Sequence, residues 1–192
     1  MCSSDLEEKL ATIGVSPDLP EVTDPKAFRQ RHGLEDVPVI LYVGRMMPQK
    51  GAKALLAAAK EVWNTIPTSR FVFIGPSTVE SEEWFKDPDP RIIYLGRVSQ
   101  QEKADALAAC DIFCMPSLSE ILPTVYLEAW SYAKPVIGGH AEGLPDLIEG
   151  NNAGIAVGQN SDDIAIAVLR ILQEPALGQQ FGLAGQLLVE NQ

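Results

Sequence analysis

The sequence predicts an α/β fold, a doubly wound, Rossmann-like parallel sheet of about six strands. From Val39 onward, short apolar runs rich in Val and Ile alternate with longer segments that have helical spacing. Several of the apolar runs end at a glycine, where a strand can turn away. Runs that are apolar throughout are typical of strands buried on both faces, and parallel connections require helices. The alternation therefore predicts a sheet covered by helices on both sides.

The first half of the alternation supplies three strands and two helices. The strands are expected in "VPVILYVG" (37–44), "RFVFIG" (70–75) and "RIIYLG" (91–96), which are rich in β-branched and aromatic residues. "AKALLAAAKEVWNTI" (52–66) consists largely of strong helix formers and predicts a helix after the first strand. "QQEKADALAAC" (100–110) predicts an amphipathic helix after the third.

The second half continues the same pattern with shorter elements. "DIFCMPS" (111–117) predicts a fourth strand, and "TVYLEAWSYA" (124–133) predicts the helix behind it. "KPVIGG" (134–139) is expected to be a fifth strand, "LPDLIEG" (144–150) a short helix, and "AGIAV" (153–157) a sixth strand. In a parallel sheet of this kind ligands bind at the carboxyl ends of the strands, so the loops after the strands are the informative ones.

Two further helices are expected at the carboxyl end of the chain. "SDDIAIAVLRILQ" (161–173) opens with Ser161 and Asp162, which are suitable cap residues. "PALGQQFGLAGQLLVEN" (175–191) begins with Pro175, a residue that favours the first position of a helix. Both segments are therefore predicted to be helical from their first residues.

The amino-terminal part of the chain does not follow the alternation. Residues 1–38 are interpreted as a linker or lead-in segment, with one helix expected in "DPKAFRQRHGL" (24–34). The first six residues, "MCSSDL" (1–6), also match the translation of one frame of a common sequencing adapter. Our hypothesis is that they are an assembly artefact and that the natural protein extends further upstream. The domain itself is expected over 39–192.

Charge and hydropathy exclude several classes of partner. The 26 acidic and 15 basic side chains give a net charge of -11, which argues against binding of duplex nucleic acid. No apolar run approaches the roughly 18 to 20 residues of a membrane span, and the amino terminus lacks the order of a secretory signal. We therefore predict a cytoplasmic protein without a membrane span.

The cysteines predict neither a disulfide framework nor a metal site. Three are present, Cys2, Cys110 and Cys114. Three residues separate the last two, and this spacing is not one of the usual zinc pairings. Buried free thiols are the expected state.

The loop after the first strand, "GRMMPQKG", has the character of an anion site. Arg45 and Lys50 lie on either side of a proline, and Gly51 leads into the next helix. Unpaired amides and the helix dipole favour an anion at that point, and the two cations add to the attraction. The loop is neither a P-loop nor a dinucleotide fingerprint. It predicts a phosphate or diphosphate site, with a solvated basic turn as the alternative.

The second site element is "SEILPTVYLEAW", which holds two carboxylates. Glu120 is expected in a loop, and Pro123 in the first turn of a helix leaves the amides of Thr124 and Val125 free for an anion. Eight helical residues rise about 12 Å to Glu128, too far for a glycosidase pair, which needs roughly 5 to 9.5 Å. Carboxylates that bracket a ribose and a sugar through hydroxyl groups fit better. A loop charge and a surface helix residue are the alternative.

These segments together resemble a known family. "VGRMMPQKG", "YLGRV", "ALAACDIFCMPSLSE" and the pattern E-x-L-P-x4-E-A followed by "KPVI" occur in this order. The series resembles the nucleotide-binding C-terminal domain of GT-B retaining glycosyltransferases of the glycosyl transferase group 1, or family-4, type. The resemblance covers roughly Val39 to Glu190, and Ile121 stands where one family variant has glycine.

The resemblance implies a donor-binding half of an enzyme that transfers a hexose from a nucleoside-diphosphate sugar to a polysaccharide, glycolipid or other glycan. By this resemblance Arg45 and Lys50 neutralise the diphosphate, Glu128 holds the ribose and Glu120 meets the transferred sugar, so that Arg45, Lys50 and Glu120 are the catalytic candidates. The donor-binding candidates that it implies are Gly44, Arg45, Lys50, Gly75, Arg97, Val98, Glu120, Leu122, Pro123, Thr124, Val125 and Glu128.

No metal and no cofactor other than the donor are implied. In GT-B enzymes the acceptor site lies mostly on an N-terminal half, which this sequence does not contain, so a glycan or lipid-linked acceptor would bind through that half. The sequence alone is expected to bind a nucleotide sugar and to transfer nothing. Two alternatives stay open: a non-catalytic nucleotide-binding or scaffold module with the same fold, and a related GT-B sugar-nucleotide epimerase.

Overall fold

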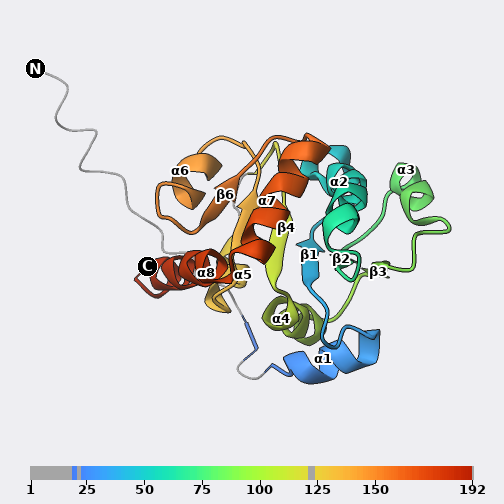
Figure 1. The fold of residues 1–192 in the computed structure, drawn as a ribbon, viewed down its shortest axis with the longest axis horizontal. Coiled ribbons are helices and arrows are strands. Elements are labelled where there is room, and N and C mark those ends of the chain that lie inside the picture. Colours follow the sequence, from blue (N-terminus) through green and yellow to red (C-terminus); the bar gives the residue numbers. More distant parts are fainter. Residues whose placement is uncertain (1–18, 21–22, 121–123, 192) are drawn as a thin grey trace, which may run out of the picture.

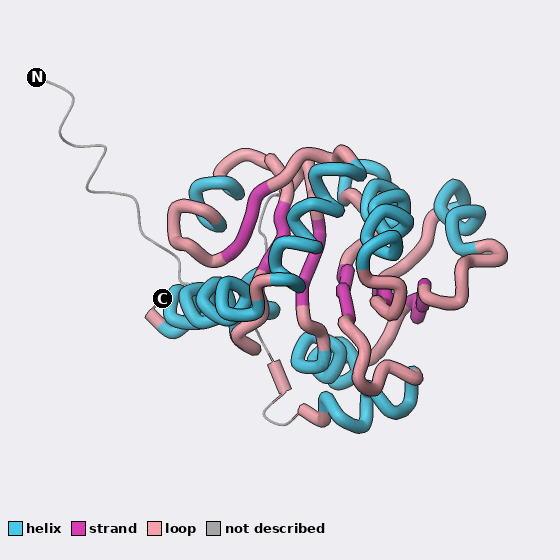
Figure 2. The backbone as a smooth tube through the Cα atoms, viewed as in Figure 1, coloured by secondary structure: helices cyan, strands magenta, loops and turns pink. Residues whose placement is uncertain are grey.

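The centre of the molecule is a six-stranded parallel sheet in the order β3-β2-β1-β4-β5-β6 (Figure 1). The computed structural model describes residues 19–20, 23–120 and 124–191. The strands lie between helices, as Figure 2 shows in magenta and cyan. The predicted doubly wound α/β class is confirmed. The strands are β1 (Val39–Val43), β2 (Arg70–Ile74), β3 (Ile92–Gly96), β4 (Ile112–Met115), β5 (Val136–Gly138) and β6 (Gly154–Ala156).

The order of the strands places a crevice beside β1. The chain runs from β1 outward through β2 to β3, and then returns to place β4 on the other side of β1. Leu41 in β1 pairs with Val72 on one side and with Phe113 on the other. Connections that leave β1 and β4 in opposite directions open a crevice at their carboxyl ends, where ligands bind in this class of fold.

The helices form two packed groups around the sheet. Helix α2 packs against α7, whereas α4 packs against α1 and α5, and α5 against α8 (Figure 1). Every residue of β1 and β4 is buried, so both faces of the centre of the sheet are covered. The helices are α1 (Pro25–His32), α2 (Ala52–Thr65), α3 (Val79–Glu82), α4 (Gln100–Ala109), α5 (Thr124–Ser131), α6 (Leu144–Ile148), α7 (Ser161–Gln173) and α8 (Pro175–Glu190), with short 3-10 turns η2 (Pro48–Lys50) and η3 (Glu83–Phe85).

The expected lead-in helix exists and packs into the core. Asp24 caps α1 by accepting a hydrogen bond from the amide of Ala27 at 2.9 Å, and Gly33 ends the helix with a φ of 62°. Phe28 is fully buried. The segment before β1 thus shares the hydrophobic core of the sheet, and the domain boundary at residue 39 stays a prediction.

Two local expectations were wrong. The N-cap of α7 is Asn160, whose side chain accepts a hydrogen bond from the amide of Asp162 at 2.9 Å, so Ser161 is already the first helical residue. Helix α4 is not amphipathic, because four consecutive residues, 104–107, are buried. The reason is that α1 covers the side of α4 that a simple two-layer arrangement would leave exposed.

The cysteines within the described residues are buried free thiols, as predicted. Cys110 and Cys114 both lie in the core, and Cys2 lies outside the described part of the chain. Burial raises the pKa of the Cys110 thiol to about 12, so the thiol stays protonated. Among the helices of the described residues, none combines the length and the apolar character that crossing a bilayer requires.

Candidate functional site

The candidate site consists of two adjoining cavities at the carboxyl ends of the central strands. Their volumes are about 220 Å³ and 330 Å³, and both are lined by Val43, Gly44, Arg45 and Lys103. The first cavity extends toward the loop after β4 and the start of α5, and the second toward the loops after β2 and β3. All predicted site residues that the structure describes line one or both cavities: Gly44, Arg45, Lys50, Gly75, Arg97, Val98, Glu120, Thr124, Val125 and Glu128.

The remaining two predicted residues, Leu122 and Pro123, lie outside the described residues. The structure adds Val43, Ile74, Pro76, Lys103 and Met115 to the lining, and none of these was singled out from the sequence. Four of them are apolar, while Lys103 brings a charge.

The loop after β1 is fixed by contacts to its own strand and to the loop after β2. The Tyr42 hydroxyl donates a hydrogen bond to the carbonyl oxygen of Arg45 at 2.9 Å, and the amide of Met46 donates to the carbonyl oxygen of Pro76 at 3.0 Å. Burial, together with the charge of Glu120, raises the pKa of Tyr42, which keeps the phenol protonated as a donor. The Arg45 side chain is exposed, and the described residues provide no hydrogen-bond or ion-pair partner for it. Arg45 is therefore a cation that is free to meet a ligand.

The wall of the second cavity is built from closely packed backbone. Gly75 has a φ of 133°, and a Cβ atom there would lie 2.0 Å from the carbonyl oxygen of Gly44. The amide of Gly75 donates to the carbonyl oxygen of Gly96 at 2.7 Å, and the hydroxyl of Tyr94 donates to the carbonyl oxygen of Gly75 at 3.0 Å. Only glycine fits at this point without a collision, so the loops after β1 and β2 can lie in direct backbone contact at the cavity wall.

The loops after β1 and β4 are joined into one wall. The amide of Leu118 donates to the carbonyl oxygen of Gln49 at 2.9 Å, and the Gln159 side-chain amide donates to the carbonyl oxygens of Gln49 and Pro116, each at 2.9 Å. Gly51, with a φ of 83°, lets the start of α2 pass Pro116, because a Cβ atom would lie 2.5 Å from the carbonyl oxygen of Pro116. The two sequence motifs are thus held together by hydrogen bonds to backbone carbonyl groups, one from a backbone amide and two from the Gln159 side chain.

Two ion pairs lie inside the first cavity. Lys50 Nζ is 2.9 Å from Glu120 Oε1, and Lys103 Nζ is 2.8 Å from Glu128 Oε1. The side chains of Glu120 and Glu128 are only 10% and 12% exposed. The other carboxylate oxygen of Glu128, Oε2, is buried and has no hydrogen-bond partner among the described residues. The predicted carboxylates therefore line one cavity, each beside a lysine.

Lys103 was missed because the sequence places it in a helix that was interpreted only by its apolar pattern. One signal could have found it. Ser99 caps α4 by accepting from the amide of Glu102 at 3.1 Å, so Lys103 lies in the first turn of the helix that follows β3. The first turn after a parallel strand lies at the carboxyl edge of the sheet, where ligands bind.

The charges at the site suit an anion that carries hydroxyl groups. Arg45, Lys50, Arg97 and Lys103 are four cations against the two carboxylates, which leaves two net positive charges on a chain whose net charge is -11. Thr124 and Val125, in the first turn of α5, also line this cavity, and the first amides of a helix have no partner within the helix. Such a site matches a diphosphate ester, with the carboxylates available as acceptors for hydroxyl donors.

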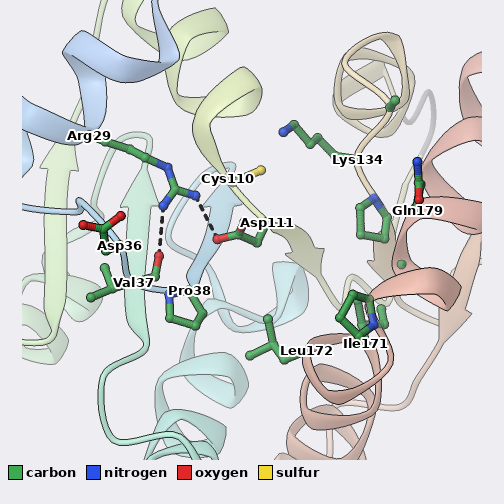
Figure 3. A pocket seen from close by; sticks show the side chains of 14 residues that line it. Arg29, Asp36, Val37, Pro38, Cys110, Asp111, Lys134, Ile171, Leu172 and Gln179 are labelled. Carbon is green, nitrogen blue, oxygen red and sulfur yellow. Dashed lines mark hydrogen bonds and ion pairs between the residues drawn. The ribbon is translucent and has the colours of Figure 1, made fainter.

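A larger cavity of about 600 Å³ lies at the opposite, amino-terminal edge of the sheet (Figure 3). Arg29 dominates it, but its guanidinium donates to the carbonyl oxygens of Val37 at 2.9 Å and Ala109 at 2.6 Å and pairs with Asp111 at 2.8 Å. These bonds attach α1 to the sheet. The charged group of Arg29 is therefore already engaged in holding α1 in place. The size of this cavity alone does not identify it as the ligand site.

A comparison of the sequence with known protein families identifies the family of this chain. Residues 37–174 match the sequence pattern of the family described as Glycosyl transferases group 1. The chain belongs to this family. The predicted resemblance is confirmed, and the matched region includes both loops that line the first cavity.

A relative in Corynebacterium glutamicum is named GDP-mannose-dependent monoacylated alpha-(1-6)-phosphatidylinositol monomannoside mannosyltransferase. It is 31% identical over 185 residues, which is 91% of this chain and 48% of the relative. This glycosyl transferase chain thus spans about half the length of the curated relatives it matches.

Solved structures show the same fold. The C-terminal domain of a glycosyl transferase group 1 family protein from Francisella tularensis superposes with a TM-score of 0.76 at 22% identity, and the match covers 93% of this chain and 98% of that domain. The Anabaena protein HepE, solved in complex with UDP and glucose, superposes with a TM-score of 0.76 at 20% identity, over 87% of this chain and 47% of HepE. The fold of this chain is therefore that of one half of a GT-B glycosyltransferase.

Proposed function

We propose that this chain is the donor-binding half of a retaining glycosyltransferase that transfers a hexose from a nucleoside-diphosphate sugar to a polysaccharide, glycolipid or other glycan. One observation carries the proposal: four cations, Arg45, Lys50, Arg97 and Lys103, and two carboxylates line adjoining cavities at the carboxyl ends of the central strands. A diphosphate needs the cations, and the ribose and the sugar need hydroxyl acceptors. The second cavity, with Ile74, Pro76 and Val98 in its lining, is where the base would fit.

The two cavities divide the donor between them. Arg45 and Lys50 would bind the diphosphate, together with the first amides of α5, and Glu120 would accept hydroxyl groups of the sugar. The base would enter the second cavity, where Arg97, Val98 and the backbone around Gly75 form the wall. Glu128 lies in the cavity shared with the diphosphate, which suits the ribose between phosphate and base.

Catalysis by this half would consist of stabilising the leaving group. As the bond from the anomeric carbon to the diphosphate oxygen breaks, negative charge gathers on the diphosphate, and fixed cations lower the energy of that state. The acceptor oxygen then bonds to the anomeric carbon on the same face, and its proton passes to a phosphate oxygen. Since side chains supply the positive charge and the leaving phosphate supplies the base, we propose that neither a metal nor a separate cofactor takes part.

The acceptor side is proposed to lie on an N-terminal half outside this sequence. The relative from Corynebacterium glutamicum, of which this chain covers 48%, has a lipid-linked acceptor in its name, which supports a glycan or lipid-linked acceptor here. We expect the chain alone to bind donor and to transfer no sugar. The cytoplasmic location stays a prediction.

A thermal-shift titration with UDP, GDP and ADP tests the donor site. A nucleotide at about 100 times its dissociation constant adds roughly 2.7 kcal/mol to the folded state. We expect one nucleotide to raise the melting temperature, and Arg45→Ala and Glu128→Ala to abolish the shift. Arg170→Ala is the matched control, because Arg170 is 55% exposed and lies on α7, outside both cavities. No shift with any nucleotide, in a folded chain, would contradict the proposal and favour a scaffold module that binds no nucleotide.

A further inference from the structure

A separate cavity of about 630 Å³ lies outside the donor crevice, between helix α2 and the segment that joins β2 to β3. Its volume is within the range of small-molecule sites. The α2 residues that line it run from Lys53 to Asn64, which is about 16 Å of helix, so the cavity is an elongated groove. We call it the α2 groove. It shares no described lining residue with the two donor cavities.

The α2 groove carries more positive than negative charge. Four cations line it against two carboxylates, whereas the chain as a whole has a net charge of -11. A positive surface on an acidic protein attracts anions to one place. The cations are Lys53, Lys60, Lys86 and Arg91, and the carboxylates are Asp87 and Asp89.

One part of the groove wall is a fixed stack of side chains. The Arg91 guanidinium donates to both carboxylate oxygens of Asp89, at 2.9 and 2.8 Å, and its central carbon lies 3.9 Å from the centre of the Trp63 ring. The Trp63 indole in turn donates to the carbonyl oxygen of Ser69 at 3.1 Å. Arg91 is therefore neutralised and held in place, so this part of the groove is preformed.

The two lysines of α2 differ from the other cations. Lys86 pairs with Glu83 at 3.3 Å. Lys53 and Lys60 are both exposed, and the described residues provide no ion-pair or hydrogen-bond partner for either side chain. They are two helical turns apart and lie on one face of α2. The two lysines are therefore placed to bind anionic groups along the groove.

The other groups in the groove suit a sugar. Trp84 is half-buried, and its ring centre lies 5.8 Å from Lys53 Nζ, so its indole can present an apolar face beside a cation. The side-chain oxygens of Asn64 and Asp87 are acceptors for hydroxyl groups. An aromatic face, hydroxyl acceptors and free cations together match sugar rings that carry negative charge.

We infer that the α2 groove binds an acidic oligosaccharide, in which sugar rings carry anionic groups, at a site separate from the donor crevice. Trp84 packs against a sugar ring, and Lys53 and Lys60 pair with the anionic groups. Lys53 is one helical turn from Lys50 of the first donor cavity, so a glycan held in the groove lies beside the crevice. The inference goes beyond the proposed donor site and does not depend on a bound nucleotide.

An anionic membrane surface fits this region less well. Glu80, Glu82 and Glu83 are exposed on α3 and η3, directly before Trp84 in the chain. An extended anionic surface would meet these carboxylates and be repelled, whereas a single saccharide chain contacts only the lining of the groove. The charge pattern therefore favours a discrete ligand.

The experiment is a calorimetric titration of the whole chain, without nucleotide, with tetragalacturonate and with maltotetraose, an uncharged chain of the same number of sugar units. We expect tetragalacturonate to bind about tenfold or more tightly. Lys53→Met and Lys60→Met should each weaken its binding about threefold, and the double variant about tenfold, because each exposed ion pair is weak. Trp84→Leu should weaken it about threefold. Lys26→Met is the matched control, because Lys26 is exposed on α1 and lies outside the groove.

Several results would overturn the inference. One is that the folded chain binds no tetragalacturonate, or binds both oligosaccharides equally. Another is that the double variant, shown to be folded by its melting temperature, keeps the wild-type affinity. A third is that the chain binds phosphatidylglycerol vesicles through the two lysines and no oligosaccharide, which would assign the groove to a lipid surface. The nucleotide titration of the wild type tests the donor site by itself, so the two failures are distinguishable.

Discussion

Lys50 and Glu120 are 70 positions apart in the sequence, yet Lys50 Nζ lies 2.9 Å from Glu120 Oε1. The pair joins the loop after β1 to the loop after β4, on the two sides of the crevice where the strand order reverses. Lys50 Nζ also donates to the carbonyl oxygen of Ser119 at 2.5 Å. The lysine therefore shapes the wall of the cavity before any donor enters, and it can also present its charge to a phosphate.

Replacing Lys50 with methionine is expected to weaken nucleoside-diphosphate binding about tenfold to hundredfold. The variant loses a charge-assisted hydrogen bond, typically about 1.5–3 kcal/mol, and leaves Glu120 as an unpaired negative charge beside the diphosphate. Isothermal titration with the nucleotide that binds the wild type measures the change. Lys86→Met is the control, because Lys86 is 68% exposed and pairs with Glu83 outside both cavities. Equal affinities for the Lys50 variant and the wild type would contradict the role.

Substituting Gly75 with alanine is expected to lower the free energy of unfolding by about 2 kcal/mol or more. The added Cβ would lie 2.0 Å from the carbonyl oxygen of Gly44, and the backbone φ of 133° is one that alanine avoids. Gly33→Ala is the matched control: its φ is 62°, nothing lies within 4 Å of the added atom, and only about 1 kcal/mol of strain is expected. Urea unfolding of both variants would show whether the collision with the Gly44 carbonyl oxygen lowers the free energy of unfolding beyond the strain at φ. Equal losses of unfolding free energy in the two variants would argue against such a cost.

Much of the fold could be predicted because local signals agree with the tertiary structure. Segments such as β1 and β4 are buried at every position, so they suit a strand with both faces covered, and they occur where they were expected. The loops of the site followed from one rule, that ligands lie at the carboxyl ends of parallel strands. That rule is enough to bring Arg45, Lys50 and the two glutamates to one crevice.

Three features of the structure could not be predicted from the sequence. The first depends on contacts between distant segments. The rotation of α4 about its axis is set by α1 and α5, and this rotation turns Lys103 toward Glu128. The second is the start of α7. Asn160 and Ser161 are both suitable N-cap residues, and the helix begins at Ser161, so that Asn160 is the cap. Helix α3 and turn η3 were missed, since four- and three-residue elements are too short to show periodicity.

Replacing Arg29 with lysine is expected to cost about 3 kcal/mol of stability while leaving nucleotide binding unchanged. The guanidinium reaches the carbonyl oxygens of Val37 and Ala109 and the carboxylate of Asp111 at once, with distances from 2.6 to 2.9 Å. A lysine has a single nitrogen and cannot span these acceptors, so buried carbonyl groups lose their donors. Urea unfolding and a nucleotide titration measure the two effects, with Arg31→Lys, 50% exposed, as control. A small loss of stability, or a clear loss of affinity, would contradict the separation between α1 and the site.

The buried thiol of Cys110 is expected to make the folded state less stable as the pH rises from 9 to 10. Burial raises the pKa of this thiol from 9.0 to about 12, so between these values the unfolded chain loses a proton that the folded chain keeps. Stability from this group is therefore fully present below the unfolded pKa and is lost as the pH rises toward 12. With an unfolded pKa of 9.0, the loss for this residue over that single pH step is about 1 kcal/mol.

Cys110→Ala removes this contribution and should flatten the dependence, although the variant starts from a lower stability because a buried side chain is shortened. Urea unfolding at pH 9 and pH 10 for both chains gives the comparison. The range ends at pH 10 because burial also raises the pKa of Tyr42 and Tyr126, whose losses grow as the pH passes the ordinary tyrosine value of 10.0; the smaller tyrosine losses below pH 10 are the same in both chains. Cys114, whose pKa is raised by burial as well, keeps its own contribution in both chains, so the variant should lose about half of the thiol-dependent slope. An unchanged slope in Cys110→Ala would mean that the Cys110 thiol ionises in the folded protein as readily as in the unfolded chain.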